Sequence, residues 1–350
     1  MKNKILVIIL AVVVVTLAVL VGWKIMIKKD NTEGNIAVEN KENINPEENQ
    51  ENNNEEPQIK IWSGDSRSVA IMIDNVGDAR PQAGINEAAI VYEVTVEGSL
   101  TRLLAVYKNV KDKTATIGPV RSARPVFLDY AMENGSIFVH FGYSNRAKED
   151  IEKLKINNVN GLVASSPFWR TKEKKAPHNV LTNMEKILKY SEDKGYNLKE
   201  SKRTVLNYVP EEVELEDGEV ANSINIPYTG TYKVSYKYNE ETKLYERYVN
   251  NSVQKDWVTN DVRTTKNIIV TYANNYTTDE EPGAGRQEVE NIGDLKGYYL
   301  TDGKIIKIIC SKASRSAQTI YKNENGEEIK VNDGNTYVQI VPLKTEVTYE

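Results

Sequence analysis

The chain contains 350 residues, with 45 Lys and Arg, 50 Asp and Glu, two His and one Cys. This length allows two domains with separate hydrophobic cores. The net charge of −5 lacks the basic excess of a general nucleic-acid-binding protein, so we expect no nucleic-acid partner. Because Cys310 is the single cysteine, the sequence excludes an intrachain disulfide and a cysteine-rich zinc site.

The first segment, residues 1–29, is predicted to be a transmembrane signal-anchor. Residues 5–21 are an unbroken apolar run. The stretch that continues to residue 27 reaches the roughly 20 residues that a helix needs to cross the hydrocarbon core of a bilayer. The alternative is a cleaved signal peptide, but the run ends in Trp23 and Lys24 and not in an Ala-x-Ala cleavage site. Lysines flank both ends of the run, so charge alone leaves its orientation open.

Residues 30–57 are predicted to be a disordered acidic linker. They contain nine Asp and Glu residues, one lysine and many asparagines. A segment of this composition cannot bury enough apolar surface to offset the entropy lost on ordering. We therefore expect the folded part of the chain to begin near residue 58.

Residues 58–225 are predicted to form a mixed α/β layered domain. Short apolar runs indicate strands at residues 69–73, 88–94, 103–107 and 136–141. Apolar periodicity predicts helices at residues 126–132 and 144–154. A third helix is expected to open with a capping box from Thr182 to Glu185 and to end before Gly195. Interleaved strands and helices are typical of layered α/β and α+β domains.

Residues 226–350 are predicted to form a mostly antiparallel β domain, which makes the whole chain α+β. Strict alternation at residues 231–238 and 244–249, separated by a turn, indicates a hairpin. Further strands are expected at residues 267–272, 297–300, 304–310 and 337–341.

Several segments, in this order along the chain, resemble the YerB-like lipoprotein family. The most specific is Ile117-Gly-Pro-Val-Arg-Ser-Ala-Arg124; the others lie at residues 68–75, 79–82, 91–93, 101–105, 176–179, 297–299 and 337–342. The resemblance implies an extracytoplasmic, membrane-attached envelope protein with N- and C-terminal domains of unassigned biochemical function.

The chain departs from the family pattern at four places, one of which is Glu97-Gly98-Ser99 in place of Glu-Gly-Gly. Residues 140–144 read His-Phe-Gly-Tyr-Ser where the family has His-His-Gly-Gly-Ser, and Ala88-Ala89 replaces Ala-Asp. The apolar run stands where the family carries its lipidation cysteine. A mechanism that needs paired histidines or the missing aspartate is therefore not supported by this sequence.

Polar residues gather near predicted strand ends in the first domain, where open α/β sheets place their ligand sites. Arg121 and Arg124 flank Ser122 after a Gly-Pro turn and could present two planar forks to a phosphate or carboxylate. Asp74 ends a strand and is the candidate ligand for a divalent cation; no other cofactor is expected. The candidate anion site consists of Arg80, Arg102, Arg121, Ser122, Arg124, His140, Arg170, His178 and Asn179.

Two other interpretations remain open at this point. The arginines could instead pair with Asp74, Glu93 and Glu97 in a buried network that only fixes loop geometry. His140 and His178 could act as a general base if they meet in space, although either alone fits a structural role better.

The favoured hypothesis is a binding or scaffold module without enzymatic activity. It would be held in the cell membrane by a single N-terminal helix, with its soluble domains outside the cytoplasm, where they bind a cell-wall component or a wall-synthesis protein. The alternative is an enzyme that acts on phosphorylated envelope lipids or glycans through the arginine-rich site. No catalytic sequence motif decides between the two.

Overall fold

The computed structural model describes residues 57–110, 115–199, 205–279 and 281–350, which form one compact unit. The predicted anchor at residues 1–29 and the linker up to residue 56 lie outside this part of the chain. None of the helices within the described ranges is long and apolar enough to cross a membrane.

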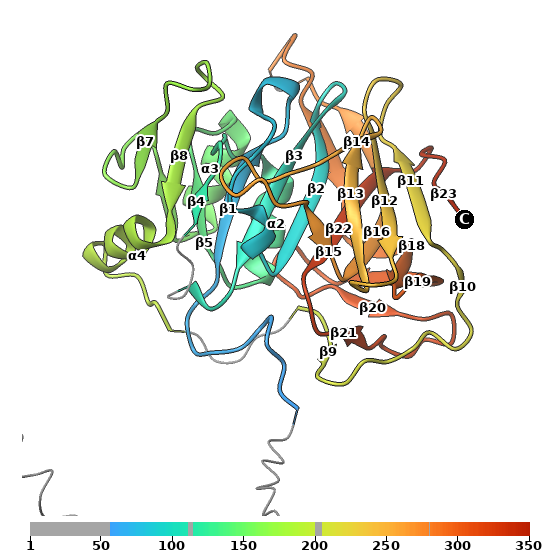
Figure 1. Cartoon of the computed structure of the whole chain (residues 1–350). Helices are drawn as coiled ribbons and strands as arrows, with labels where there is room; N and C mark the ends of the chain where they lie inside the picture. Colours follow the sequence, from blue (N-terminus) through green and yellow to red (C-terminus); the bar gives the residue numbers. More distant parts are fainter. Residues whose placement is uncertain (1–56, 111–114, 200–204, 280) are drawn as a thin grey trace, which may run out of the picture. The chain divides into compact units, whose positions relative to one another are not determined.

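The centre of the fold is a mixed sheet of 12 strands among the described residues (Figure 1). Its order is β10 (Glu219–Val220), β19 (Lys304–Lys312), β18 (Gly293–Thr301), β16 (Asn267–Thr277), β22 (Thr336–Pro342), β2 (Ile90–Glu97), β3 (Leu100–Tyr107), β1 (Val69–Asp74), β5 (Ile137–His140) and β6 (Asn158–Asn160). Two further strands extend it: β17 (Gln287–Glu290) pairs with β16, and β20 (Ile320–Lys322) pairs with β19.

The two halves of the sequence share this sheet. Strand β22, close to the C-terminus, lies between β16 and β2 and runs parallel to both, so that Gln339 stands opposite Glu93. The α+β class is confirmed in its coarse form, since a mixed sheet with few helices is followed by mostly antiparallel strands. The predicted domain boundary at residue 225 stays a prediction. Strands from both sides of this residue lie in the main sheet, so the sheet does not mark a boundary there.

Smaller sheets and three helices complete the described part of the fold. A six-stranded sheet contains β14 (Ser252–Val253), β13 (Leu244–Val249), β12 (Lys233–Asn239), β11 (Ser223–Pro227), β23 (Thr348–Tyr349) and β15 (Thr264–Thr265). The remaining strands are β4 (Thr116–Ile117), β8 (Val180–Asn183) and β7 (Phe168–Arg170) in one sheet, and β21 (Val331–Asn332) and β9 (Tyr208–Val209) in another. The helices are α2 (Pro125–Glu133), α3 (Asn145–Lys153) and α4 (Met184–Asp193), with 3-10 turns η1 (Gly77–Ala79) and η2 (Ile85–Glu87).

Both faces of the main sheet are covered, which explains the continuous apolar runs in the sequence. On one face, Ile71 of β1 belongs to the same core as Tyr236 of the six-stranded sheet. On the other face, Met72 shares a core with Phe127 of α2 and Ala147 of α3. The layers can be followed in Figure 1.

The third predicted helix is present, but its predicted capping box is wrong. Asn183 is the N-cap of α4, and its side-chain oxygen accepts a hydrogen bond from the backbone N–H of Lys186 at 3.0 Å. Thr182 instead stays in β8, and its hydroxyl donates to the carbonyl of Pro167 at 2.9 Å. Pairing of β8 with β4 and β7 holds Thr182 extended, so the cap falls one residue later.

A fully buried ion pair joins the two largest sheets. Glu93 of β2 and Arg247 of β13 are both 0% exposed, and the Arg247 Nη2 donates to Glu93 Oε2 at 2.7 Å. The other carboxylate oxygen accepts hydrogen bonds from Tyr232 at 2.7 Å, Thr101 at 2.8 Å and Asn75 at 3.1 Å. These hydrogen bonds compensate the buried carboxylate for its removal from water, whereas the Nε and Nη1 atoms of Arg247 are buried without a hydrogen-bond partner.

We predict that Arg247→Met lowers the free energy of unfolding by about 3–5 kcal/mol, because it leaves the Glu93 carboxylate buried without a cation. Adding Glu93→Gln removes that charge, so the double variant is expected to regain part of the loss. Urea unfolding followed by circular dichroism measures both effects. A single-variant loss below about 1 kcal/mol, the range of exposed pairs, would contradict this role for the pair.

Candidate functional site

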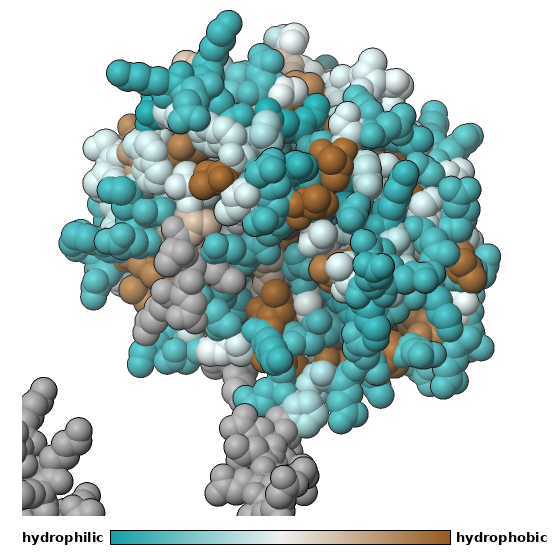
Figure 2. Space-filling view, in the orientation of Figure 1, coloured by the Kyte–Doolittle hydropathy of each residue, from teal (hydrophilic) through white to brown (hydrophobic). Residues whose placement is uncertain are grey.

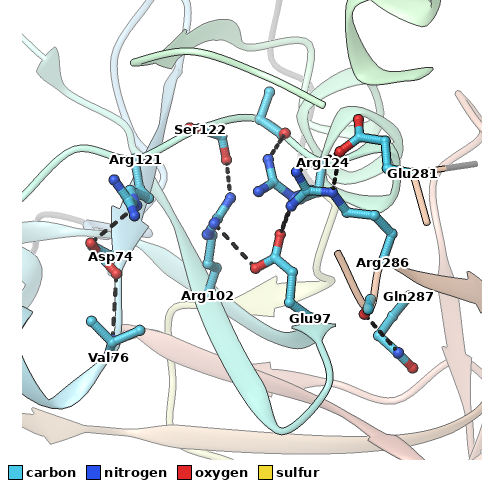
Figure 3. Close-up of polar contacts among 12 residues, drawn as sticks. Asp74, Val76, Glu97, Arg102, Arg121, Ser122, Arg124, Glu281, Arg286 and Gln287 are labelled. Carbon is cyan, nitrogen blue, oxygen red and sulfur yellow. Dashed lines mark hydrogen bonds and ion pairs between the residues drawn. The ribbon is translucent and has the colours of Figure 1, made fainter. Parts of the chain in front are cut away.

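Three of the predicted site residues meet at the end of β1. Asp74 is the last residue of the strand, and its side chain is 1% exposed. Its Oδ2 atom lies 2.8 Å from the Nδ1 atom of His178, which precedes β8, and 3.3 Å from the Nε atom of Arg121, in the loop before α2. We call these three residues the Asp74 cluster; the Asp74–Arg121 contact is drawn in Figure 3.

Backbone hydrogen bonds fix the Arg121 loop against the strand end. The backbone N–H of Arg121 donates to the carbonyl of Met72 at 2.9 Å, and that of Asp74 donates to the carbonyl of Pro119 at 2.8 Å. Gly118 opens this loop at φ +145°, and a Cβ atom there would lie 2.8 Å from the Val180 carbonyl oxygen. Glycine therefore permits the close approach of this loop to β8.

Arg121 and His178 remain partly open to solvent. Their side chains are 26% and 17% exposed, whereas the carboxylate between them is buried. Within the described residues, Asp74 is the one hydrogen-bond or ion-pair partner of either side chain. The Nη atoms of Arg121 and the Nε2 atom of His178 are therefore left for a ligand or water.

The arginines at 102 and 124 belong to a separate group around Glu97. Glu97 accepts from Arg102 Nη2 at 3.2 Å and also pairs with Arg124 and Arg286, an arrangement visible in Figure 3. Arg102 further donates to the carbonyl of Ser122 at 2.6 Å. We call Glu97, Arg102, Arg124 and Arg286 the Glu97 cluster. It matches the interpretation in which the arginines pair with a carboxylate and fix a loop, although three arginines share the one carboxylate of Glu97.

Sequence reasoning missed Arg286 because it lies 189 residues from Glu97 and carries no local motif. Its second carboxylate partner is Glu281, which accepts from Arg286 Nη2 at 2.8 Å. An isolated antiparallel β-bridge between the backbones of Glu97 and Arg286 brings the second half of the chain to the end of β2.

Burial and charge act in opposite directions within the Glu97 cluster. Burial favours the protonated carboxyl of Glu97, but the charges of Arg102 and Arg124 outweigh it and lower the pKa below the ordinary 4.5. Burial, together with the charge of Arg124, lowers the pKa of Arg102 to about 9. Both groups therefore remain charged at neutral pH.

In the described part of the chain, the side chains of His140 and Ser122 bond to neighbouring backbone and to Asn158, not to the Asp74 cluster. His140 is buried, with Nδ1 2.8 Å from the Gly142 carbonyl oxygen and Nε2 3.2 Å from Asn158 Oδ1. Burial lowers the pKa of this imidazole, which favours its neutral form. The Ser122 hydroxyl donates to a backbone carbonyl at 3.0 Å. The two histidines thus share no hydrogen-bond partner.

Arg170 and Asn179 form a pair of their own. The Arg170 Nη1 donates to Asn179 Oδ1 at 2.6 Å, and the guanidinium lies 5.2 Å from the ring centre of Phe141. The Asn179 amide also donates to the carbonyl of Thr171 at 3.0 Å. These contacts link β7 to the loop that carries His178.

Arg80, like Arg170, forms no ion pair with the residues that the structure describes. Its guanidinium lies 5.3 Å from the ring centre of Tyr232, and its Nη1 atom is buried without a hydrogen-bond partner.

Asp74 remains a predicted metal ligand without further support from its surroundings. Over the described ranges, no group of three or more His, Cys, Asp or Glu residues could hold a metal ion. The Oδ2 atom of Asp74 already faces nitrogen atoms of His178 and Arg121, so a cation at this oxygen would have to displace one of them.

Comparison with known proteins gives the family. The model described as "Protein of unknown function (DUF3048) N-terminal domain" matches residues 56–197, and the corresponding C-terminal domain model matches residues 224–338. The chain is 32% identical over 286 residues to "Putative lipoprotein YerB" of Bacillus subtilis (strain 168), covering 80% of each protein. The crystal structure of YerB protein from Bacillus subtilis matches with a TM-score of 0.72 and 30% identity, over 81% of this chain and 94% of that one.

The matched proteins define a two-domain class whose biochemical function is unassigned. The chain belongs to the DUF3048 family and is homologous to YerB, which confirms the resemblance identified from its sequence motifs.

We predict that Glu97→Gln lowers the free energy of unfolding by about 3 kcal/mol at pH 7, because three guanidinium groups lose their shared carboxylate. The native pKa of Glu97 is lower than its unfolded value, so its contribution is complete above about pH 4.5 and is lost as the pH falls through the native pKa. The difference between the variant and the wild type should therefore shrink below pH 4.5. A pH series of urea unfolding curves measures it, and a difference that stays constant down to pH 3 would contradict the assignment.

Proposed function

We propose that the chain is an envelope protein that binds an anionic group of a cell-wall component outside the cytoplasm, without catalysis. The observation that carries this proposal is the Asp74 cluster, in which Arg121 and His178 share one buried carboxylate and keep the Arg121 Nη groups and the His178 Nε2 atom toward solvent. The ligand group would be a phosphate or a carboxylate.

The geometry suits anion binding in a specific way. The guanidinium of Arg121 contacts Asp74 through Nε, so both Nη groups are available as a planar fork for two oxygen atoms. His178 contacts Asp74 through Nδ1, so its Nε2 atom is left toward the same ligand. Asp74 thus orients both side chains and compensates the charge of Arg121.

The Glu97 cluster has a supporting role in this proposal. Arg102 binds the backbone at Ser122, and Arg124 donates to the carbonyl of Ala123 at 2.6 Å, so both hold the loop next to Arg121. The predicted anion site is thereby reduced to Arg121 and His178, with Arg102 and Arg124 as positioning residues.

The surface in view in Figure 2 agrees with a ligand recognised by polar contacts. It is mostly hydrophilic, with small and separate hydrophobic patches. Large contiguous apolar patches, by contrast, are typical of protein or membrane interfaces.

Membrane attachment forms part of the same proposal. The homologous Bacillus subtilis protein is named a lipoprotein, which indicates association with the membrane for that protein. In this chain the predicted single-pass helix at residues 1–29 would provide the attachment, and the acidic linker would separate it from the folded part outside the cytoplasm.

An enzyme acting on phosphorylated envelope lipids or glycans is the second candidate. The 2.8 Å contact between His178 Nδ1 and Asp74 favours it, because a carboxylate that orients a histidine is a common general-base arrangement. Release of phosphate or pyrophosphate from a lipid-linked precursor, abolished by Asp74→Asn, would select this activity over binding alone.

We predict that Arg121→Gln weakens binding to purified anionic wall polymer at least tenfold, the equivalent of about 1.4 kcal/mol or more for losing a bidentate charged contact. Lys189→Gln is the matched control, since it removes the same charge from an exposed position on α4. Cosedimentation of the protein with the polymer measures the affinity, and circular dichroism confirms that both variants are folded.

The polymer itself provides a second control. For a polymer whose charge is carried by carboxylates, reduction of these groups to alcohols leaves the chain intact, and binding by the wild type should then fall to the level of Arg121→Gln. Equal affinity of Arg121→Gln and wild type, or undiminished binding to the neutral polymer, would contradict the proposed site.

A further inference from the structure

A hollow of about 480 Å³ opens beside Arg80, at a place where both halves of the chain meet. Its first-half wall comes from Arg80 and Pro81, and its second-half wall from the segment between β14 and β15. Two hydrogen bonds fix the walls to each other: the Gly84 N–H donates to Asp256 at 2.6 Å, and the Trp257 N–H donates to the Gln82 carbonyl at 3.0 Å. The hollow is therefore a fixed feature of the joined halves.

Arg80 brings an unsatisfied cation to this hollow. It lines the hollow, has no carboxylate partner in the described part of the chain, and has a buried Nη1 atom without a hydrogen-bond partner. A buried donor that makes no hydrogen bond destabilises the fold. The Nε and Nη2 groups of Arg80 are not buried in this way and make no hydrogen bond to the described residues, so they can donate to an anionic oxygen atom of a ligand in the hollow.

The remaining charges leave the hollow positive. Lys255 lines it and forms no ion pair with the described residues. Asp256 also lines it, but its Oδ1 accepts from the backbone N–H groups of Val258 at 2.8 Å and Thr259 at 3.1 Å, and its Oδ2 accepts from Gly84. Two cations thus face one carboxylate whose oxygen atoms are already occupied.

An aromatic ring and an amide complete the lining. Trp257 is half-buried, and the ammonium of Lys174 lies 4.8 Å from its ring centre. An indole offers a flat apolar surface of the kind on which the C–H face of a sugar ring packs. The exposed amide of Asn260 lines the same hollow and can exchange hydrogen bonds with hydroxyl groups.

We propose that this hollow binds an acidic sugar, with the sugar ring against Trp257 and its carboxylate held by Arg80 and Lys255. An aromatic surface, a hydroxyl-binding amide and an unpaired guanidinium together match a ring that carries hydroxyls and one negative charge. The site shares no residue with the Asp74 cluster, so it can be tested independently of the anion site at Arg121.

The test compares N-acetylmuramic acid with N-acetylglucosamine, which has the same ring without the carboxylate. The indole N–H resonance of Trp257, assigned with Trp257→Phe, reports binding by NMR. The acidic sugar is expected to shift this resonance and to bind at least tenfold more tightly than the neutral one. Arg80→Gln should abolish this preference, and Arg121→Gln should leave it unchanged.

Lys255→Gln is a second variant in case Arg80→Gln does not fold, and it should also reduce the preference for the acidic sugar. The proposal is overturned if the acidic sugar leaves the Trp257 resonance in place, if both sugars bind equally, or if both variants keep the full preference. Loss of the preference in a folded Arg121→Gln variant would equally overturn it, because the two sites would then not be separate.

Discussion

The buried ion pair between Glu93 and Arg247 is the contact on which the arrangement of this protein depends. Each residue comes from a different half of the sequence and from a different sheet, and neither reaches water. Burial opposes the charge on Arg247, but the carboxylate of Glu93 and the surrounding tyrosines raise its pKa above the ordinary value, so it stays protonated. The pair can therefore exist only when both sheets are in place.

The same network determines the geometry of the candidate site. Asn75, which donates to Glu93, directly follows Asp74, and Gln82 donates to the Asp74 carbonyl at 3.0 Å and to Asn75 Oδ1 at 2.8 Å. Gln82 also accepts from Arg263 of the second half at 3.1 Å. The end of β1 is thus held from both halves of the chain, and the partly exposed Arg121 and His178 are positioned on a rigid base.

Local sequence patterns predicted the elements well because each depends on nearby residues. The apolar run before Asp74 became β1, and the alternating tyrosines after residue 230 became the hairpin of β12 and β13. The insertion of β22 beside β2 could not be predicted, since the pairing of Val91 with Tyr337 has no local signal. For the same reason the sequence identified Asp74, Arg121 and His178 as candidates but did not show that Glu97 would neutralise Arg102 and Arg124 instead.

The two histidines allow the most direct test of the central claim, that the Asp74 cluster receives the anionic ligand. His178 belongs to the cluster, whereas His140 is buried among Phe138, Gly142 and Asn158 and provides an internal reference. Imidazole NMR resonances are recorded while purified anionic wall polymer is added. The account predicts that the resonances of His178 shift with saturation while those of His140 stay in place. Unchanged His178 resonances in the presence of bound polymer would contradict it.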